Sequence, residues 1–161
     1  MALQVHEELV ELCKKHNITL ATCESVTGGM IASYITKVSG ASKVLKGGLV
    51  VYTNEAKEKL AHVKHETLKE YGAISMQTAV EMAFNTCGIL KSTIGIAITG
   101  NAGPNPDEDK PIGFAYLGIC IVDKVYIHKL NTKIKDRNDI QLYFTNEALK
   151  YTLEEIRKVI K

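Results

Sequence analysis

Ser25 is the residue of this chain whose setting most favours nucleophilic chemistry. It stands in the run Cys23-Glu24-Ser25-Val26-Thr27-Gly28-Gly29, between a β-prone segment and a helical one. A serine hydroxyl is a weak nucleophile at neutral pH, so it needs a neighbouring base and donors for the oxyanion that develops on an attacked carbonyl. Gly28 and Gly29 lack side chains, and N–H groups at the start of a helix suit such a negative charge.

Lys57 is the base that we expect to serve Ser25. No histidine falls beside a strand end with an acidic partner, so a Ser-His-Asp triad has no support. An ordinary lysine has a pKa of about 10.4, and burial or a cationic neighbour lowers that pKa toward the range useful for proton abstraction. Tyr52, which lies five positions before Lys57, is suited to relaying or donating a proton in the same pocket.

Each of these residues also has a purely structural interpretation. A serine before Thr-Gly-Gly is more often a helix cap than a nucleophile. Lys57 taken alone is more often a solvated charge on an amphipathic helix, and Tyr52 is equally suited to being a half-buried strand aromatic. The loop from Gly100 to Pro104 is compatible with an ordinary turn.

The sequence does not predict a metal site or another cofactor. Pro106-Asp107-Glu108-Asp109 is expected to be an exposed acidic loop, since bound cations usually need ligands that converge from several segments. His62 and His65 lie three positions apart without a third ligand in view, which favours a surface role.

The elements that must position these residues alternate between strands and helices. β-Prone runs predict strands at Ile18–Thr22, Gly47–Tyr52, Thr93–Thr99, Ile112–Ile121 and Val125–Leu130, the second of them buried. Helical periodicity and caps predict helices over 4–15, from Met30 to about Ser39, from Glu55 with Asn54 as cap, from the cap Ser75 to Gly88, and over 137–159. Ligands of open α/β sheets collect beyond the carboxyl ends of the strands, where the candidate residues fall.

The last two strands are expected to form an antiparallel hairpin. Val122-Asp123-Lys124, which joins them, is too short for a crossover helix. The predicted fold class is therefore α/β with a mixed sheet.

Composition limits the kind of protein. A chain of 161 residues fits one domain over 1–161, and 45% hydrophobic with 24% charged residues is ordinary for a globular protein. No long apolar run and no secretion-signal pattern is present, so we expect a cytoplasmic protein that does not contact membranes. The net charge is +2 and the lysines alternate with acids, which disfavours nucleic acid as a partner. The four cysteines, which form no C-x-x-C pair, are expected in the core.

Three segments of the chain resemble, in order, the motifs of the CinA C-terminal domain family, the PncC-type nicotinamide mononucleotide amidases. They are Glu24–Gly29, Gly48–Lys57 and Gly100–Pro104. Lys110-Pro111-Ile112-Gly113 and Asp136-Arg137 also stand where that family has comparable residues. The similarity extends over nearly the whole chain.

The resemblance implies a three-layer α/β/α domain with a mixed, mostly parallel sheet that contains one antiparallel hairpin. It also implies hydrolysis of the carboxamide of nicotinamide mononucleotide to nicotinate mononucleotide and ammonia. By this similarity Ser25 is the nucleophile, Lys57 the general base and Tyr52 an assisting hydroxyl. A homodimer is expected by the same analogy.

The resemblance also implies a set of substrate-binding residues. Arg137 is the expected phosphate partner because a guanidinium binds phosphate in a bidentate way. The residues expected to bind the amide or the nucleotide are Thr27, Gly28, Gly29, Thr99, Gly100, Asn101, Ala102 and Gly103.

The chain departs from the family pattern at a few positions. Cys23 and Val26 replace an alanine and a cysteine of the first motif, and Asn101 stands where an apolar residue is common. Residues 105–109, Asn-Pro-Asp-Glu-Asp, replace a glycine-rich stretch and add negative charge near the site expected for a phosphate. Three alternatives therefore stay open: a catalytically impaired pyridine-nucleotide-binding module of the same fold, a related amidase for a different small amide, and an interaction subunit in which Ser25 is only a cap.

Overall fold

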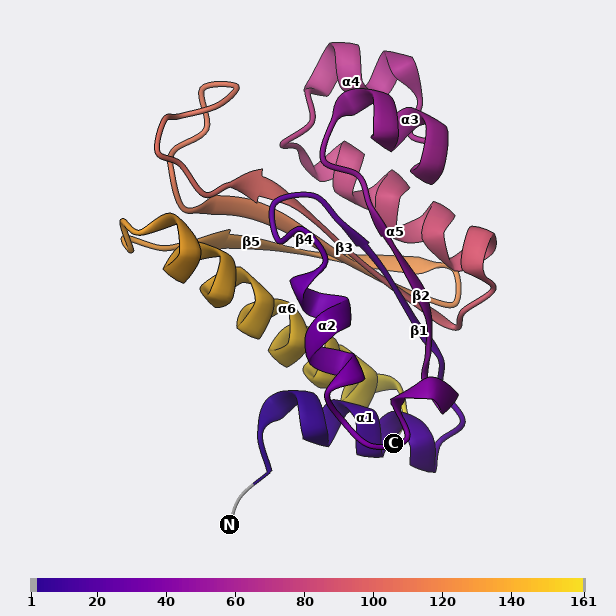
Figure 1. The fold of residues 1–161 in the computed structure, drawn as a ribbon. Helices are drawn as coiled ribbons and strands as arrows, with labels where there is room; N and C mark the ends of the chain where they lie inside the picture. The colour runs from indigo at the N-terminus through magenta and orange to yellow at the C-terminus, as the bar shows by residue number, and fades with distance from the viewer. Residues whose placement is uncertain (1–2, 161) are drawn as a thin grey trace.

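A five-stranded mixed sheet forms the middle layer of the protein (Figure 1). This computed structural model describes residues 3–160. The strands are β1 (Leu20–Glu24), β2 (Leu45–Val50), β3 (Ile94–Asn101), β4 (Phe114–Ile121) and β5 (Lys124–Asn131), in the spatial order β2-β1-β3-β4-β5. β1 pairs in parallel with β2 and β3, while β4 pairs antiparallel with β3 and β5. Within this sheet β4 alone therefore runs against the other strands.

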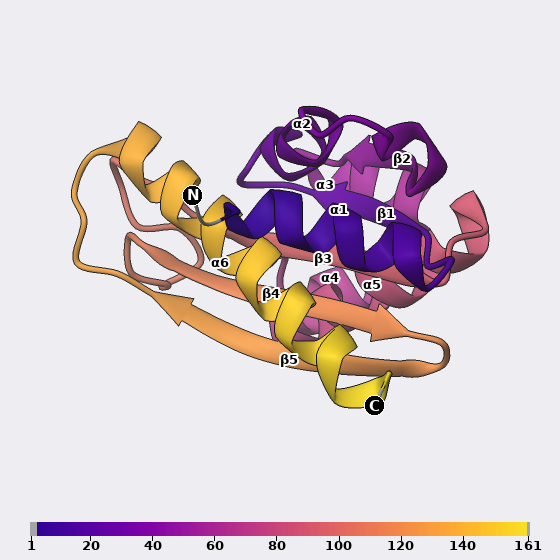
Figure 2. The same ribbon diagram turned by 90° about the horizontal axis from the view of Figure 1, so that it is seen from below.

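Helices cover both faces of the sheet, which gives three layers (Figures 1 and 2). One face carries α1 (Val5–Lys15), α2 (Met30–Thr36) and the long α6 (Arg137–Val159). The other carries α5 (Met76–Leu90), with α3 (Asn54–Ala61) and α4 (His65–Tyr71) beside it. The expected three-layer α/β/α fold with a mostly parallel sheet and a β4–β5 hairpin is confirmed.

The two faces of the sheet differ in side-chain size. Ile94, Ile96 and Ile98 of β3 are buried in the larger core, together with residues of α1, α2 and α6. On the α5 face, Gly95 leaves room for the helix, because a Cβ there would lie 2.4 Å from the Ala83 carbonyl oxygen. Small residues thus let α5 pack close to the strands that carry the candidate site.

Several boundaries differ from the sequence predictions for local reasons. The segment expected as a buried strand is β2, whose residues alternate between partly buried and exposed because it is an edge strand. Thr53, rather than Asn54, caps α3, since its hydroxyl accepts the Ala56 N–H. Neither α4 nor the short 3₁₀ helix at Ala41–Lys43 was predicted. The Ser75 cap and the bounds of α6 are as predicted.

The remaining expectations from composition concern the cysteines and the membrane. Cys13, Cys23 and Cys120 are buried and Cys87 is partly buried, all as free thiols. Among residues 3–160, no helix combines the length and apolar character that crossing a membrane requires.

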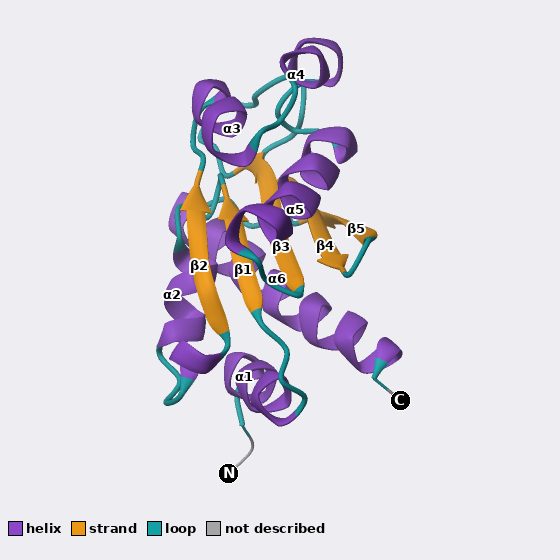
Figure 3. Ribbon diagram, turned by 90° about the vertical axis from the view of Figure 1, so that its right-hand side faces the viewer, coloured by secondary structure: helices purple, strands orange, loops and turns teal. Residues whose placement is uncertain are grey.

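The carboxyl ends of β1, β2 and β3 point to the same edge of the sheet (Figure 3). α3 and α4 lie at this edge, above the ends of the strands. Ser25 and Tyr52 follow β1 and β2, and residues 100–104, expected as a loop, include the last two residues of β3 and the segment after it. The fold therefore brings together the segments in which sequence reasoning placed the chemistry.

Candidate active site

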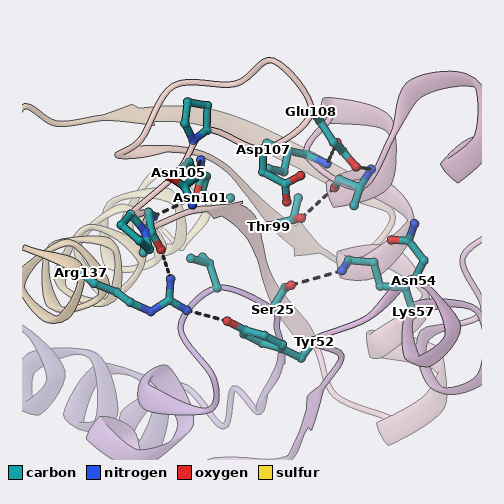
Figure 4. A pocket seen from close by; sticks show the side chains of 18 residues that line it. Ser25, Tyr52, Asn54, Lys57, Thr99, Asn101, Asn105, Asp107, Glu108 and Arg137 are labelled. Carbon is teal, nitrogen blue, oxygen red and sulfur yellow. Dashed lines mark hydrogen bonds between the residues drawn. The ribbon is translucent and has the colours of Figure 1, made fainter. Parts of the chain in front are cut away.

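A cavity of about 530 Å³ opens at the carboxyl edge of the sheet (Figure 4). Five segments of the chain meet there. They are the turn after β1, the segment after β2 with the start of α3, the 73–74 connection, the end of β3 with its following loop, and the start of α6. Its lining residues are Ser25, Val26, Tyr52, Asn54, Lys57, Ala73, Ile74, Thr99, Gly100, Asn101, Ala102, Gly103, Pro104, Asn105, Pro106, Asp107, Glu108 and Arg137.

Ser25 and Lys57 are in direct contact at the base of this cavity. The Lys57 Nζ lies 3.2 Å from the Ser25 Oγ and 3.2 Å from the Val51 carbonyl oxygen. Lys57 is only 2% exposed, so it is not a solvated surface charge. Ser25 is not a helix cap either, because α2 begins at Met30 with Gly29 as the preceding residue. The two structural interpretations of these residues are therefore wrong.

Burial lowers the pKa of Lys57 below its ordinary value. The charged amine loses its hydration inside the protein, which favours the neutral form. Glu108 and Asp107 act in the opposite direction, because negative charge near an amine favours its protonated form. A neutral lysine beside a serine hydroxyl is able to take the hydroxyl proton.

Thr27, Gly28 and Gly29 do not line the cavity, contrary to the expectation that they bind substrate there. Thr27 donates its hydroxyl to the buried carboxylate of Glu24, at 2.6 Å. The Gly28 N–H donates to the Ser25 carbonyl oxygen at 3.1 Å. Gly28 and Gly29 both have positive φ angles, of 59° and 103°, so the glycines are needed for the turn itself.

The side chain of Glu24 binds the N-terminus of α2, where the sequence analysis expected the substrate to bind. Its carboxylate accepts the backbone N–H groups of Ile31 and Ala32 at 2.8 and 2.9 Å. These are donors that the first turn of a helix otherwise leaves unpaired. The Glu24 side chain is fully buried, so the anion-binding end of this helix is satisfied from within the protein.

Tyr52 and Arg137 form a second pair in the cavity, in which Tyr52 lies between Ser25 and Arg137 (Figure 4). One guanidinium nitrogen donates to the Tyr52 hydroxyl oxygen at 2.6 Å, and the other donates to the Gly103 carbonyl oxygen. Both acceptors are uncharged, and among residues 3–160 Arg137 forms no ion pair. Its positive charge is therefore available to an anionic group. Tyr52 is 57% exposed at the rim, so it is not the half-buried strand aromatic of the structural interpretation.

The end of β3 and the loop after it form one wall of the cavity, and hydrogen bonds hold this wall in place. The Asn101 Oδ1 accepts the Gly103 N–H at 2.9 Å, and its Nδ2 donates to the Asn105 carbonyl oxygen at 3.0 Å. Thr99 donates its hydroxyl to the Ala73 carbonyl oxygen at 2.7 Å. Gly100 and Ala102 also line this wall.

Glu108 ties the acidic loop to the segment that precedes α5. Its carboxylate accepts the N–H groups of Ala73 and Ile74, at 2.9 and 2.8 Å. Residues 106–109 are exposed, as predicted, and Asp107 and Glu108 among them also line the cavity, which was not predicted. No pattern in the sequence joins this loop to residues 73–74, because the contact spans 34 positions.

Among the described residues, no group of three or more His, Cys, Asp or Glu side chains is arranged to hold a metal.

Asn54 is a further lining residue that the sequence prediction assigned elsewhere. It was expected to cap α3, but as the first residue of that helix its side chain faces the cavity (Figure 4). Its position three residues before Lys57 is the signal that would have found it, since residues three apart share a helix face.

The fold and the site together define a class of three-layer α/β/α domains that hold a serine against a buried lysine at the carboxyl edge of the sheet. The chain belongs to the CinA C-terminal domain family, whose model matches residues 2–156.

Comparisons with individual proteins agree with this assignment. A CinA-like protein of Kosmotoga olearia is 41% identical over 157 residues, which is 97% of this chain but 37% of that protein. The chain thus spans little more than a third of this relative's length. The crystal structure of competence/damage inducible protein CihA from Agrobacterium tumefaciens is 33% identical, with a TM-score of 0.86 and coverage of 96% of this chain and 98% of that one. A competence or damage-inducible protein from Enterobacter asburiae is 28% identical, with a TM-score of 0.89 and coverage of 96% and 99%.

Proposed function

We propose that this domain is an amidohydrolase that converts nicotinamide mononucleotide to nicotinate mononucleotide and ammonia. The observation that carries the proposal is the 3.2 Å contact between the Ser25 Oγ and the buried Lys57 Nζ inside a cavity large enough for a small ligand. The Arg137 guanidinium, which donates only to uncharged oxygens among the described residues, suits a phosphate. The choice of nicotinamide mononucleotide as the substrate rests on the resemblance of three motifs to the nicotinamide mononucleotide amidases.

The chemistry proceeds through an ester of Ser25. Neutral Lys57 takes the hydroxyl proton as the Ser25 oxygen attacks the carboxamide carbon, and a tetrahedral oxyanion forms. Val26 directly follows Ser25 on the cavity wall, and we assign its N–H to the oxyanion in place of Gly28. The C–N bond then breaks, and the Lys57 ammonium returns a proton to the leaving nitrogen, which departs as ammonia.

Water completes the cycle. Lys57, neutral again, takes a proton from a water molecule that attacks the ester carbon, and the C–O bond to Ser25 breaks. The proton returns to the serine oxygen, and the product leaves as a carboxylic acid that ionises. We also assign to the Tyr52 hydroxyl, which accepts a hydrogen bond from Arg137, a role in assisting proton transfer.

Release of ammonia from nicotinamide mononucleotide tests this proposal. Ser25→Ala and Lys57→Ala each remove one partner of the pair, and each is expected to lower kcat by at least about 100-fold. Lys59→Ala is the matched control, because Lys59 lies on the same helix but is exposed and paired with Glu55. Full turnover in either variant of the pair, or an inactive wild-type protein, would contradict the assignment.

A pyridine-nucleotide-binding module without turnover is the second candidate. It is favoured by the acidic residues that stand in the cavity wall where the family usually has glycines. Calorimetry would support it by detecting binding of nicotinamide mononucleotide to the wild-type protein while no ammonia is formed. A different small amide as substrate is supported instead if only that amide is hydrolysed. The homodimer and the cytoplasmic location stay predictions.

A further inference from the structure

The two sides of the cavity carry opposite charge. Arg137 lies on one side, whereas Asp107 lies beside Thr99 on the side that holds Ser25 and Lys57 (Figure 4). Asp107 is also close enough to Lys57 to act on its charge. The negative charge of residues 105–109 was expected near the phosphate site, and Figure 4 shows that Asp107 lies away from Arg137.

Within the part of the chain that the structure describes, the side chain of Asp107, unlike that of its neighbour Glu108, has no hydrogen-bond or ion-pair partner. The Glu108 carboxylate accepts hydrogen bonds from two backbone N–H groups. Among residues 3–160, the Asp107 side chain makes neither a hydrogen bond nor an ion pair, and it lines the cavity. The carboxylate therefore faces the place where the reacting part of a ligand would lie.

Lys57 does not neutralise this carboxylate in the working enzyme. A lysine that acts as a base must be neutral, so the side of the cavity that holds Asp107 then has a negative charge without a positive counterpart. A ligand that brings a positive charge beside its amide would supply that counterpart.

We propose that Asp107 is a specificity-determining residue, which selects amides whose ring carries a fixed positive charge. This inference rests on the proposed function and deepens it. In nicotinamide mononucleotide, the carboxamide is attached to a cationic pyridinium and the phosphate lies at the far end. These two charges match Asp107 and Arg137. The reduced dihydropyridine form has the same carboxamide and phosphate but an uncharged ring, and it is the poorer substrate.

The experiment compares these two substrates on the same enzyme. Ammonia release from the oxidised and reduced mononucleotides is measured at mildly alkaline pH for the wild type, Asp107→Asn and Asp109→Asn. Because the preference is a ratio of two kcat/KM values, changes in Lys57 ionisation or in the folded fraction cancel. Asp109 is the matched control, since it is in the same loop and exposed but does not line the cavity.

The wild type is expected to prefer the oxidised substrate, and Asp107→Asn to lower that preference about fivefold, the effect of one partly solvated ion pair. Asp109→Asn should leave the ratio unchanged. Added salt should weaken the wild-type preference, because it screens charges that solvent reaches.

Two failures have different meanings. If the wild type hydrolyses nicotinamide mononucleotide but Asp107→Asn has the wild-type ratio, the inference is wrong and the proposed function stands. An equal loss of preference in Asp109→Asn would also overturn it, since the effect would then come from the charge of the loop as a whole. If no protein releases ammonia from either substrate, the proposed function fails and the inference with it.

Discussion

Lys57 combines two properties that rarely occur together, a positive charge in its ordinary state and nearly complete burial. Its amine is held by the Ser25 hydroxyl and by the Val51 carbonyl oxygen, both of which are uncharged. Among residues 3–160 no ion pair offsets the loss of hydration, and the pKa of Lys57 falls. Perturbed groups of this kind concentrate at functional sites, where a base is needed near neutral pH.

The pH dependence of the reaction should follow Lys57. The protonated amine cannot act as a base, so kcat/KM rises with pH and levels off once Lys57 is neutral. Because burial lowers the pKa of Lys57, this levelling occurs below the pH at which an ordinary lysine, with a pKa of 10.5, would titrate. A pH profile of ammonia release checks it.

Asp107→Asn should move that profile toward lower pH. Asp107, together with Glu108, raises the pKa of Lys57 against the effect of burial. Removing one negative charge disfavours the protonated amine, so the pKa falls further. A profile that stays in place, or moves toward higher pH, would show that Asp107 does not act on Lys57.

At the scale of elements, the turn between β1 and α2 is built to hold Ser25 in place. The Glu24 carboxylate accepts hydrogen bonds from the Thr27 hydroxyl and from two backbone N–H groups in the first turn of α2. The Gln141 side chain of α6 donates to the Val26 carbonyl oxygen at 3.0 Å. Ser25 itself is joined to β3, since its N–H donates to the Ile98 carbonyl oxygen at 3.1 Å. The nucleophile is thus positioned by a strand, a helix cap and a distant helix together.

Glu24→Gln should destabilise the protein by about 2 kcal/mol, because hydrogen bonds to a buried charged group are lost and an amide NH₂ is turned toward backbone donors. The free energy of unfolding, measured by urea denaturation, checks this value. Glu11→Gln is the control, since Glu11 is exposed and paired only with Lys14; its effect should stay within about 0.5 kcal/mol. Equal effects in the two variants would mean that the cap does not stabilise the turn.

At the scale of the whole molecule, α6 joins the site to the core. Arg137, its first residue, lies in the cavity, while Phe144, two turns later, is fully buried against the sheet. The same core includes Ile96 and Ile98 of β3, the strand whose end carries the 99–103 wall. Packing of this helix therefore fixes the distance between the two ends of the cavity.

Phe144→Ala should lower the free energy of unfolding by about 3–5 kcal/mol, since it removes a ring from a close-packed core and leaves a cavity. Phe84→Ala is the matched control: Phe84 is 48% exposed on α5, and its loss should change stability by about 0.5 kcal/mol or less. Thermal or urea unfolding of both variants gives the comparison. A small effect at Phe144 would mean that α6 does not depend on this contact.

The sequence by itself determined most of the elements and the residue types at the site. Periodicity predicted α6 within its observed bounds, and the short 122–124 connection predicted the β4–β5 hairpin. These features are local, because backbone preference and the alternation of apolar residues act within a few positions. The short helix α4 was missed, since its seven residues show too little periodicity.

Only the tertiary structure decided which groups face one another. Ser25 and Lys57 are 32 positions apart, and Tyr52 and Arg137 are 85 apart. In the folded protein the Glu24 carboxylate binds the N-terminus of α2, which was expected to bind substrate. Asp107 and Arg137 lie on different sides of the cavity. Partners of this kind are selected by distance and burial in the folded chain. Spacing along the sequence carries neither quantity, which is why the charge arrangement of the cavity could not be inferred from it.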